Sequence, residues 1–310
     1  MKIIFGLEKI KKFKKPVVAL GVFDGVHRGH RFILRQTIKK AREIGGTSIA
    51  VTFYPHPQAQ KSLYSLEHRL SLIAEIGIDV CIVIKFDRAF SRIPAAEFIE
   101  KILVGKLGAS VIYVGKNFRF GRSAEGDCRL LKKNAKVFGY AFRSFDVIRT
   151  KRYPVSSTYI RKLITQGDLT AAEKLLSRPV AVFGTVIKGI SLARKLGFPT
   201  ANIDPHHEIL PPSGVYAVRV ILDSDIFNGV CNIGTKPTLI TKPDELGSAP
   251  QKHIEVYIFD FNKNIYGKDM EIQFVKRIRN ELKFPSLELL AEQIKKDIVV
   301  AGKSLSRRKL

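Results

Sequence analysis

Two histidines lie three residues apart where an apolar run gives way to a helical pattern. In GVFDGVHRGH (residues 21–30), His27 and His30 share one side of the first turn of the expected helix. Backbone N–H groups and the positive end of the helix dipole meet there, and imidazoles can donate hydrogen bonds to phosphate oxygens. Gly25 and Gly29 allow close approach of a phosphate. The stretch indicates a phosphate-chain site, with a simple helix cap and glycine turn as the alternative.

Three further segments of the first half place polar residues next to turns. They are TFYPHP (52–57) with Pro55, His56 and Pro57, VGKNFRFGR (114–122) with Asn117, Arg119 and Arg122, and YPVSSTYIRKL (153–163) with Ser157, Thr158 and Arg161. The amide and guanidinium groups suit ribose, phosphate or flavin contacts. Ser157 or Thr158 is expected to cap a helix, and Arg161 one turn on would complete an anion clamp. A structural turn, a solvated basic loop and a plain cap are the alternatives.

A second polar site is expected in GFPTANI (197–203). Pro199 fixes the backbone just before Thr200 and Asn202, which point the same way in an extended chain. A hydroxyl and an amide oxygen on one side suit Mg²⁺, which keeps phosphate and water oxygens as its remaining ligands. A polar turn without a metal is the alternative.

Glu255 interrupts an otherwise apolar strand pattern in HIEVYIFDF (253–261). Strand alternation places it on the face opposite Ile254 and Val256. Inside a barrel beside bound Mg-ATP, this carboxylate would accept a proton from a substrate hydroxyl. A solvated glutamate on a strand is the alternative.

The elements that must position these residues change in type along the chain. Up to about residue 150, expected strands (16–23, 47–53, 79–86, 110–115, 141–148) alternate with expected helices (28–45, 66–76, 94–107, 127–138). This alternation predicts a doubly wound α/β domain, whose parallel sheet binds ligands at the carboxyl ends of its strands. From about residue 180, short strands (181–187, 214–222, 229–234, 253–261, 270–275) precede a helix at 286–298, which predicts an antiparallel barrel. The predicted domains are 1–179 and 180–310.

Composition limits the class of protein and its partners. A chain of 310 residues with 45% hydrophobic residues can form two globular domains. Lys and Arg number 53 against 28 Asp and Glu, a net charge of +25 that favours anionic partners. The cysteines (Cys81, Cys128, Cys231) form neither a CxxC pair nor an even set, which fits a reducing cytoplasm. We expect no signal peptide and no membrane span.

The four segments of the first half closely resemble the N-terminal domain of the bacterial bifunctional riboflavin kinase and FAD synthetase family. GVFDGVHRGH looks like the HxGH signature of the nucleotidyltransferase superfamily. The resemblance implies that FMN attacks the α-phosphorus of ATP and yields FAD and pyrophosphate, with His27 and His30 stabilising charge. It implies an ATP site of Gly21, Phe23, Asp24, Gly25, His27, Gly29, His30, Asn117, Ser157, Thr158 and Arg161, and a flavin site of Phe53, Pro55, His56, Arg119, Phe120 and Arg122. Ala124 stands where the family often has a basic residue, which could weaken the adenylyl transfer.

The second half resembles the riboflavin kinase domain of the same family, a six-stranded antiparallel barrel. The matching segments are GFPTANI, PPSGVYAV, CNIGTKPT, IEVYIFDFNKNIYG and RIRNELKFPSLELLAEQIKKDI. The resemblance implies that Thr200 and Asn202 contact Mg²⁺ and ATP phosphates and that Glu255 is the catalytic base for the riboflavin 5′-hydroxyl. It implies a nucleotide site of Gly184, Lys188, Gly189, Arg194, Gly197, Pro199, Thr200 and Asn202. Tyr257 replaces a common histidine.

The resulting expectation is a cytoplasmic bifunctional enzyme that converts riboflavin to FMN and FMN to FAD. Its substrates would be ATP, riboflavin and FMN, and its cofactor Mg²⁺. We expect a monomer or weak homo-oligomer without a nucleic-acid or membrane partner. Two alternatives stay open: a different HxGH adenylyl- or cytidylyltransferase, which leaves the barrel without a purpose, and an RNA-binding protein, which the charge of +25 motivates.

Overall fold

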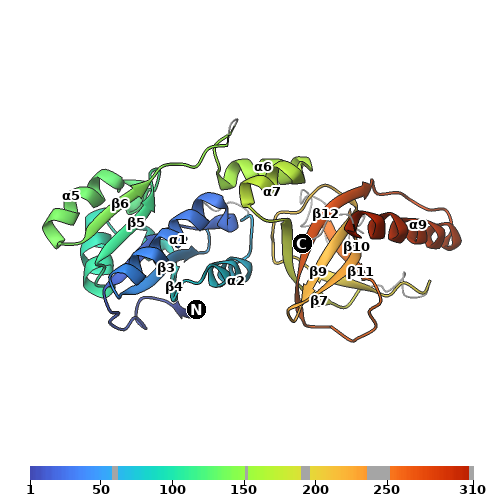
Figure 1. Ribbon diagram of the computed structural model, residues 1–310, viewed down its shortest axis with the longest axis horizontal. Helices are drawn as coiled ribbons and strands as arrows, with labels where there is room; N and C mark the ends of the chain where they lie inside the picture. The colour runs from blue at the N-terminus through green and yellow to red at the C-terminus, as the bar shows by residue number, and fades with distance from the viewer. Residues whose placement is uncertain (58–61, 151–152, 190–195, 236–251, 307–310) are drawn as a thin grey trace, which may run out of the picture. The chain divides into compact units, whose positions relative to one another are not determined.

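The computed structural model describes residues 1–57, 62–150, 153–189, 196–235 and 252–306 (Figure 1). The chain falls into two compact units, Met1–Ile160 and Arg161–Leu310. Helix α6 (Ser157–Gln166) begins in the first unit and ends in the second. The two units are described separately below.

The first unit is built on a six-stranded sheet in the order β1-β4-β3-β2-β5-β6, and every pair of neighbours is parallel. The strands are β1 (Lys2–Phe5), β2 (Pro16–Leu20), β3 (Thr47–Tyr54), β4 (Val80–Lys85), β5 (Val111–Gly115) and β6 (Ala141–Phe145). The parallel order confirms the predicted α/β domain. Strand β1 was not expected from the sequence, and it forms an edge of the sheet beside β4.

Helical segments connect these strands. They are η1 (Asp24–Val26), α1 (Arg28–Glu43), α2 (Leu66–Ile76), α3 (Arg88–Ser91), α4 (Ala95–Glu97), the π-helical η2 (Phe98–Lys106), η3 (Arg122–Ala124) and α5 (Cys128–Phe138). Helix α2 begins where the Ser65 hydroxyl accepts the N–H of His68, and it ends at Gly77 with φ 95°. The helices at 28–43, 66–76 and 128–138 lie within a few residues of their predicted positions.

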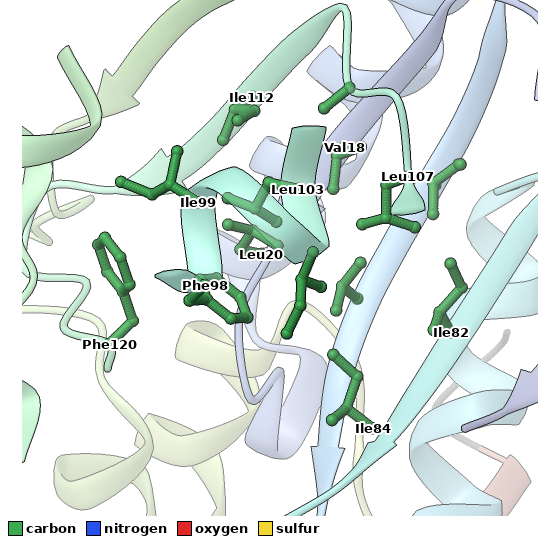
Figure 2. Close-up of a cluster of buried hydrophobic side chains, with 14 of the residues drawn as sticks. Val18, Leu20, Ile82, Ile84, Phe98, Ile99, Leu103, Leu107, Ile112 and Phe120 are labelled. Atoms are coloured by element: carbon green, nitrogen blue, oxygen red, sulfur yellow. The ribbon is translucent and has the colours of Figure 1, made fainter. Parts of the chain in front are cut away.

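The core of this unit lies between the sheet and η2 (Figure 2). Val18 and Leu20 of β2 face the same cluster as Phe98 and Leu103 of η2. Val17 and Ala19, which alternate with them on β2, are fully buried as well, so both faces of this central strand are covered. Because all strands are parallel, the loops after β2, β3 and β5 meet at one edge of the sheet.

The second unit is a closed barrel in the order β10-β11-β8-β7-β12-β9, with every neighbouring pair antiparallel. The strands are β7 (Val180–Ile187), β8 (Thr200–Asp204), β9 (Gly214–Leu222), β10 (Asp225–Thr235), β11 (Lys252–Ile258) and β12 (Asp269–Arg279). The closed barrel confirms the prediction. Helices α7 (Leu169–Leu176) and α9 (Leu287–Ser306) also belong to this unit.

Helix α9 is longer than the predicted helix, and it packs on β9, β10 and β12. An ion pair holds it to the barrel: Nε and Nη2 of Arg279 donate to the carboxylate of Asp297 at 2.7–3.0 Å. Gln293, one turn earlier on the helix, donates to the same carboxylate at 2.9 Å. Asp297 is only 3% exposed, whereas the Arg279 side chain is 18% exposed, so the carboxylate is buried and the guanidinium is partly open to water.

Candidate functional site

The turn after β2 has an unusual backbone conformation that depends on Gly25. Phe23, Gly25 and Val26 all have positive φ, at 52°, 76° and 37°. A Cβ on Gly25 would lie 2.6 Å from Cδ1 of Leu63, so a larger residue would meet both strain and a clash. The turn thereby delivers the chain into α1 at His27.

The two histidines meet directly at the start of α1. The Nδ1 atom of His27 accepts the backbone N–H of His30 at 3.3 Å, so His27 is the N-cap of the helix. The two rings stack with centroids 3.6 Å apart, and Phe23 contacts His30 edge-on at 5.4 Å. Because Nδ1 of His27 is an acceptor, the neutral ring carries its proton on Nε2. The capping bond uses Nδ1 alone, so it does not conflict with the predicted phosphate-binding role of the ring.

Asp24 fixes this turn to the rest of the first unit. It is 2% exposed, and its Oδ1 accepts the N–H of Leu63 at 2.8 Å and that of Tyr64 at 3.4 Å. Its backbone carbonyl accepts the hydroxyl of Ser157 at 2.8 Å. These contacts give Asp24 a structural role in the predicted ATP site. Its buried carboxylate already accepts backbone amides, and its negative charge would repel a phosphate rather than bind it.

Helix α6 begins one residue earlier than its predicted caps imply. The hydroxyl of Ser156 accepts the N–H of Tyr159 at 3.3 Å, which makes Ser156 the N-cap. The prediction that Ser157 or Thr158 caps the helix is therefore wrong, because the Ser157 hydroxyl is used to bond Asp24. Thr158 is exposed, and Arg161 follows one turn after Ser157 on the same helix.

The loop after β5 carries the predicted polar residues at the surface. Asn117 is exposed. Arg119 and Arg122 are exposed too, with nitrogens 3.5 Å from Asp127 and 4.0 Å from Glu125 respectively. Solvent-exposed ion pairs of this kind are weak, so both guanidinium groups can turn to an anionic ligand at little cost.

The predicted flavin-binding phenylalanines lie in the core. Phe53 is 6% exposed and packs against the rings of Phe86 and Phe90, while Phe120 is 7% exposed and packs against Phe98. A flavin contact at either ring stays a prediction. Of the neighbouring candidates, Pro55 and His56 follow β3 directly, at the ligand edge of the sheet.

One residue of this region was missed by sequence reasoning. Arg69 of α2 is 1% exposed, and its Nη1 donates to the Val22 carbonyl at 2.7 Å and approaches the Thr52 hydroxyl at 3.3 Å. Burial lowers the pKa of Arg69, and the negative charge of Asp24 opposes that shift. The sequence feature that could have pointed to Arg69 is a charged residue on the apolar face of a predicted helix.

Strand register brings the predicted kinase residues together on the barrel. Asn202 of β8 stands opposite Glu255 of β11, and Thr200 stands opposite Tyr257. On its other side Glu255 stands opposite Asn232 of β10. Directly opposed residues share a face, so Thr200, Asn202 and Glu255 form one polar surface.

This polar surface lies on the outside of the barrel. Ile254, Val256 and Ile258 are at most 4% exposed and fill the interior, whereas Glu255 between them is half-buried. The expected alternation is therefore confirmed. Glu255 faces away from Ile254, Val256 and Ile258, so it does not point into the barrel interior.

Two predicted glycines make close contacts in this unit. A Cβ on Gly189 would lie 2.1 Å from Nδ2 of Asn202, and one on Gly184 would lie 2.2 Å from the carbonyl oxygen of Asp204. Lys188 is exposed, and Gly197 has φ 86° with open space around it. The predicted Arg194 lies outside the described residues.

A cavity of about 490 Å³ opens beside Pro199 and Thr200. Apolar residues of three strands and the segment after β11 line it: Val186, Ala201, Val256, Ile258, Phe261, Asn262, Lys263, Asn264, Ile265 and Tyr266. An apolar slot with a few amides matches the usual character of a small-molecule site. Residues 261–266 were missed because the sequence of a polar turn between strands indicates only a connecting loop.

Hard oxygen ligands for a cation are present at Thr200 and Asn202. Their shared face on β8 offers a hydroxyl and an amide oxygen, which fits an ion that takes its other ligands from phosphate and water. Within the described parts of the chain, no group of three or more His, Cys, Asp or Glu side chains could hold a metal. None of the helices in those parts combines the length and apolar character needed to cross a bilayer.

Comparison with known proteins gives matches along nearly the whole chain. Residues 9–159 match the FAD synthetase family, and residues 176–305 match the riboflavin kinase family. The bifunctional riboflavin kinase/FMN adenylyltransferase of Haemophilus influenzae is 38% identical, covering 97% of this chain and 98% of its own. The protein of the same name from Bacillus subtilis is 36% identical, covering 91% and 90%.

A solved structure also matches both units. It is described as a macrolide-efflux protein from Streptococcus pneumoniae, and it aligns with a TM-score of 0.80 at 28% identity. The alignment covers 97% of this chain and 99% of that one.

Proposed function

The chain belongs to the family of bifunctional riboflavin kinase/FMN adenylyltransferases, and from this premise we propose how its residues divide the two reactions. The domain at 1–179 transfers the adenylyl group, and the domain at 180–310 phosphorylates riboflavin. The observation that supports this division is that polar residues gather at two places, one in each unit: the histidine pair at the start of α1, and the Thr200–Asn202–Glu255 face of the barrel.

In adenylyl transfer, a phosphate oxygen of FMN attacks the α-phosphorus of ATP. The bond from the α-phosphorus to the bridging oxygen breaks, and pyrophosphate leaves. Nε2 of His27 donates a hydrogen bond to the phosphates, and the stacked His30 adds a second imidazole beside it. The amides at the start of α1 bind the same negative charge. Asn117, Arg119, Arg122 and Arg161 supply further polar contacts to the nucleotide and flavin phosphates.

In the kinase reaction, the carboxylate of Glu255 takes the proton of the riboflavin 5′-hydroxyl. The resulting oxygen attacks the γ-phosphorus of ATP, and ADP leaves with the bond electrons. Asn202 and Asn232, which stand on both sides of Glu255, orient the carboxylate by their amide groups. The cavity beside Pro199 and Thr200 accommodates the purine of ATP, with its apolar walls against the ring faces.

Thr200 and Asn202 would hold Mg²⁺ on this face of β8. When bound, the ion neutralises charge on the β- and γ-phosphates and so favours the departure of ADP. Gly189 keeps the Asn202 amide in place, since its missing side chain leaves just enough room for that group.

The substrates implied by the family are ATP, riboflavin and FMN. We propose a cytoplasmic protein that is a monomer or a weak homo-oligomer. The net charge of +25 suits these anionic substrates, because a positive surface raises their local concentration.

The test is to incubate the full chain with riboflavin and Mg-ATP and to separate the flavins by chromatography. FMN should appear first and FAD second. Glu255→Gln should abolish FMN formation from riboflavin while FMN is still converted to FAD. The double variant His27→Ala, His30→Ala should do the reverse. Loss of both steps in either folded variant would contradict two independent sites, and salt-sensitive RNA binding without turnover would contradict the enzyme itself.

A further inference from the structure

Arg69 is a fully charged side chain buried in a place where an apolar one would pack. It is 1% exposed on α2, whose other buried residues include Leu66, Leu70 and Ile73. Arginine is almost never fully buried unless it is paired. Replacing a buried charge by an apolar residue of similar volume is often neutral or stabilising, so the fold alone gives little reason for a guanidinium here.

The contacts of Arg69 are directed at the histidine turn rather than at its own helix. Nη1 donates to the carbonyl of Val22 at 2.7 Å, and the hydroxyl of Thr52 donates to the same carbonyl at 2.8 Å. Val22 immediately precedes Phe23, where the backbone takes the first of its positive φ values. Two donors from different elements therefore fix the peptide from which the turn begins.

The charge of Arg69 also has a partner in this turn. Asp24 is 2% exposed and lies close enough to act electrostatically on the guanidinium. With its carboxylate bonded to two backbone amides, Asp24 is an anion next to a site for a highly charged triphosphate. A fixed positive charge behind the turn reduces this repulsion.

Nε of Arg69 has no hydrogen-bond partner among the described residues. The guanidinium directs Nη1 at the Val22 carbonyl and the Thr52 hydroxyl.

We propose that Arg69 is a positioning residue for adenylyl transfer. Through the Val22 carbonyl and the charge of Asp24 it holds the turn so that His27 and His30 stay aligned on the triphosphate. This inference rests on the adenylyltransferase activity proposed above for the first unit. Arg69 touches no substrate and takes part in no bond change.

The test compares Arg69→Met and Arg69→Lys in steady-state conversion of FMN to FAD, with riboflavin phosphorylation by the same protein as the internal control. Arg69→Met should lower kcat at least tenfold, while KM for ATP changes less than threefold. Arg69→Lys should recover part of the lost kcat, because an ammonium can still donate to the Val22 carbonyl and still carries a charge. Riboflavin phosphorylation should stay within twofold of wild type in both variants.

Thr52→Val provides a second, milder perturbation, because it removes the other donor to the same carbonyl. Its matched control is Thr37→Val, which alters an equally buried threonine whose hydroxyl bonds Ile33 within its own helix. Thr52→Val should lower kcat for FAD formation about threefold, and Thr37→Val should leave it unchanged.

The proposal is overturned if Arg69→Met leaves kcat unchanged or raises only KM. It is also overturned if Arg69→Lys is no more active than Arg69→Met. If Arg69→Met does not fold, equal rates for Thr52→Val and Thr37→Val overturn it. A wild-type protein that makes FMN but no FAD would instead refute the adenylyltransferase function on which the inference rests.

Discussion

Gly189 offers a sharp test of the kinase site, because it touches the amide of Asn202. A Cβ at this position would lie 2.1 Å from Nδ2, 2.2 Å from Cγ and 2.5 Å from Oδ1 of Asn202. The Gly189→Ala substitution therefore adds one methyl group directly onto the proposed magnesium and phosphate ligand.

The size of the effect follows from these distances. Ordinary van der Waals contact begins at 3.4 Å, so the methyl group and the amide must separate by about 1.3 Å. Asn202 is buried between strands β7 and β11, so much of this displacement must fall on its side chain or on the segment at 188–189. Misplacing a substrate-binding group by about 1 Å can cost about 10²-fold in rate. We expect kcat for riboflavin phosphorylation to fall by about 10²-fold.

The assay is riboflavin phosphorylation with Mg-ATP, measured together with FMN adenylylation in the same sample. Adenylylation should remain at the wild-type rate, because Gly189 belongs to the proposed kinase domain and not to the adenylyltransferase domain. The matched control is Gly302→Ala on α9, where an added methyl group meets nothing within 4 Å. A Gly189→Ala protein with kinase activity within twofold of wild type would refute the reasoning that Asn202 must stay where Gly189 allows it.

Two further predictions concern stability. Asp297→Asn should reduce the free energy of unfolding of the second unit by about 2 kcal/mol, because it removes the charge that pairs with the mostly buried guanidinium of Arg279. Denaturant unfolding should show this loss, and the exposed change Glu292→Gln on the same helix should not. Burial raises the pKa of Tyr140 from 10.0 to about 12, so the stability it contributes is complete below pH 10 and is lost as the pH rises through about 12. Tyr140→Phe should flatten the fall in unfolding free energy over that range, and an unchanged slope would show that Tyr140 ionises freely.

The parts of the fold with strong periodicity could be predicted from the sequence. The buried runs at 16–20 and 47–54 and the amphipathic segments at 28–43 and 128–138 carried clear patterns. Strand β1 was missed because KIIF is only four residues long and is followed by lysines. It becomes a strand because the exposed edge of β4 offers it a parallel partner, and the sequence does not show that partner.

The candidate sites were predictable in their residue types but not in their connections. The spacing of His27 and His30 predicted two rings on one side of a helix start, and the structure stacks them. The spacing could not show that Ser157 bonds Asp24, since 133 residues separate them and only the fold brings them together. For the same reason Ser156 took the capping position that was expected of Ser157 or Thr158.

The flavin contacts of Phe53 and Phe120 stay a prediction. Both rings lie in the core with other phenylalanines. Hydrophobicity makes the same residue types suitable for a core and for a ring-binding slot, so composition cannot separate the two. Residues 261–266 were not predicted as part of a site, but polar and aromatic side chains of this turn line the cavity.

The course of α6 has a consequence for dividing this protein into single-function pieces. The helix starts at Ser157, whose hydroxyl braces the Asp24 carbonyl, and it runs on to Gln166 past the limit between the compact units. A fragment ending at Ile160 would keep only four residues of it, too few to hold a helical shape in water. Whether by gene fission or in the laboratory, a split that preserves FAD synthesis has to fall downstream of Gln166.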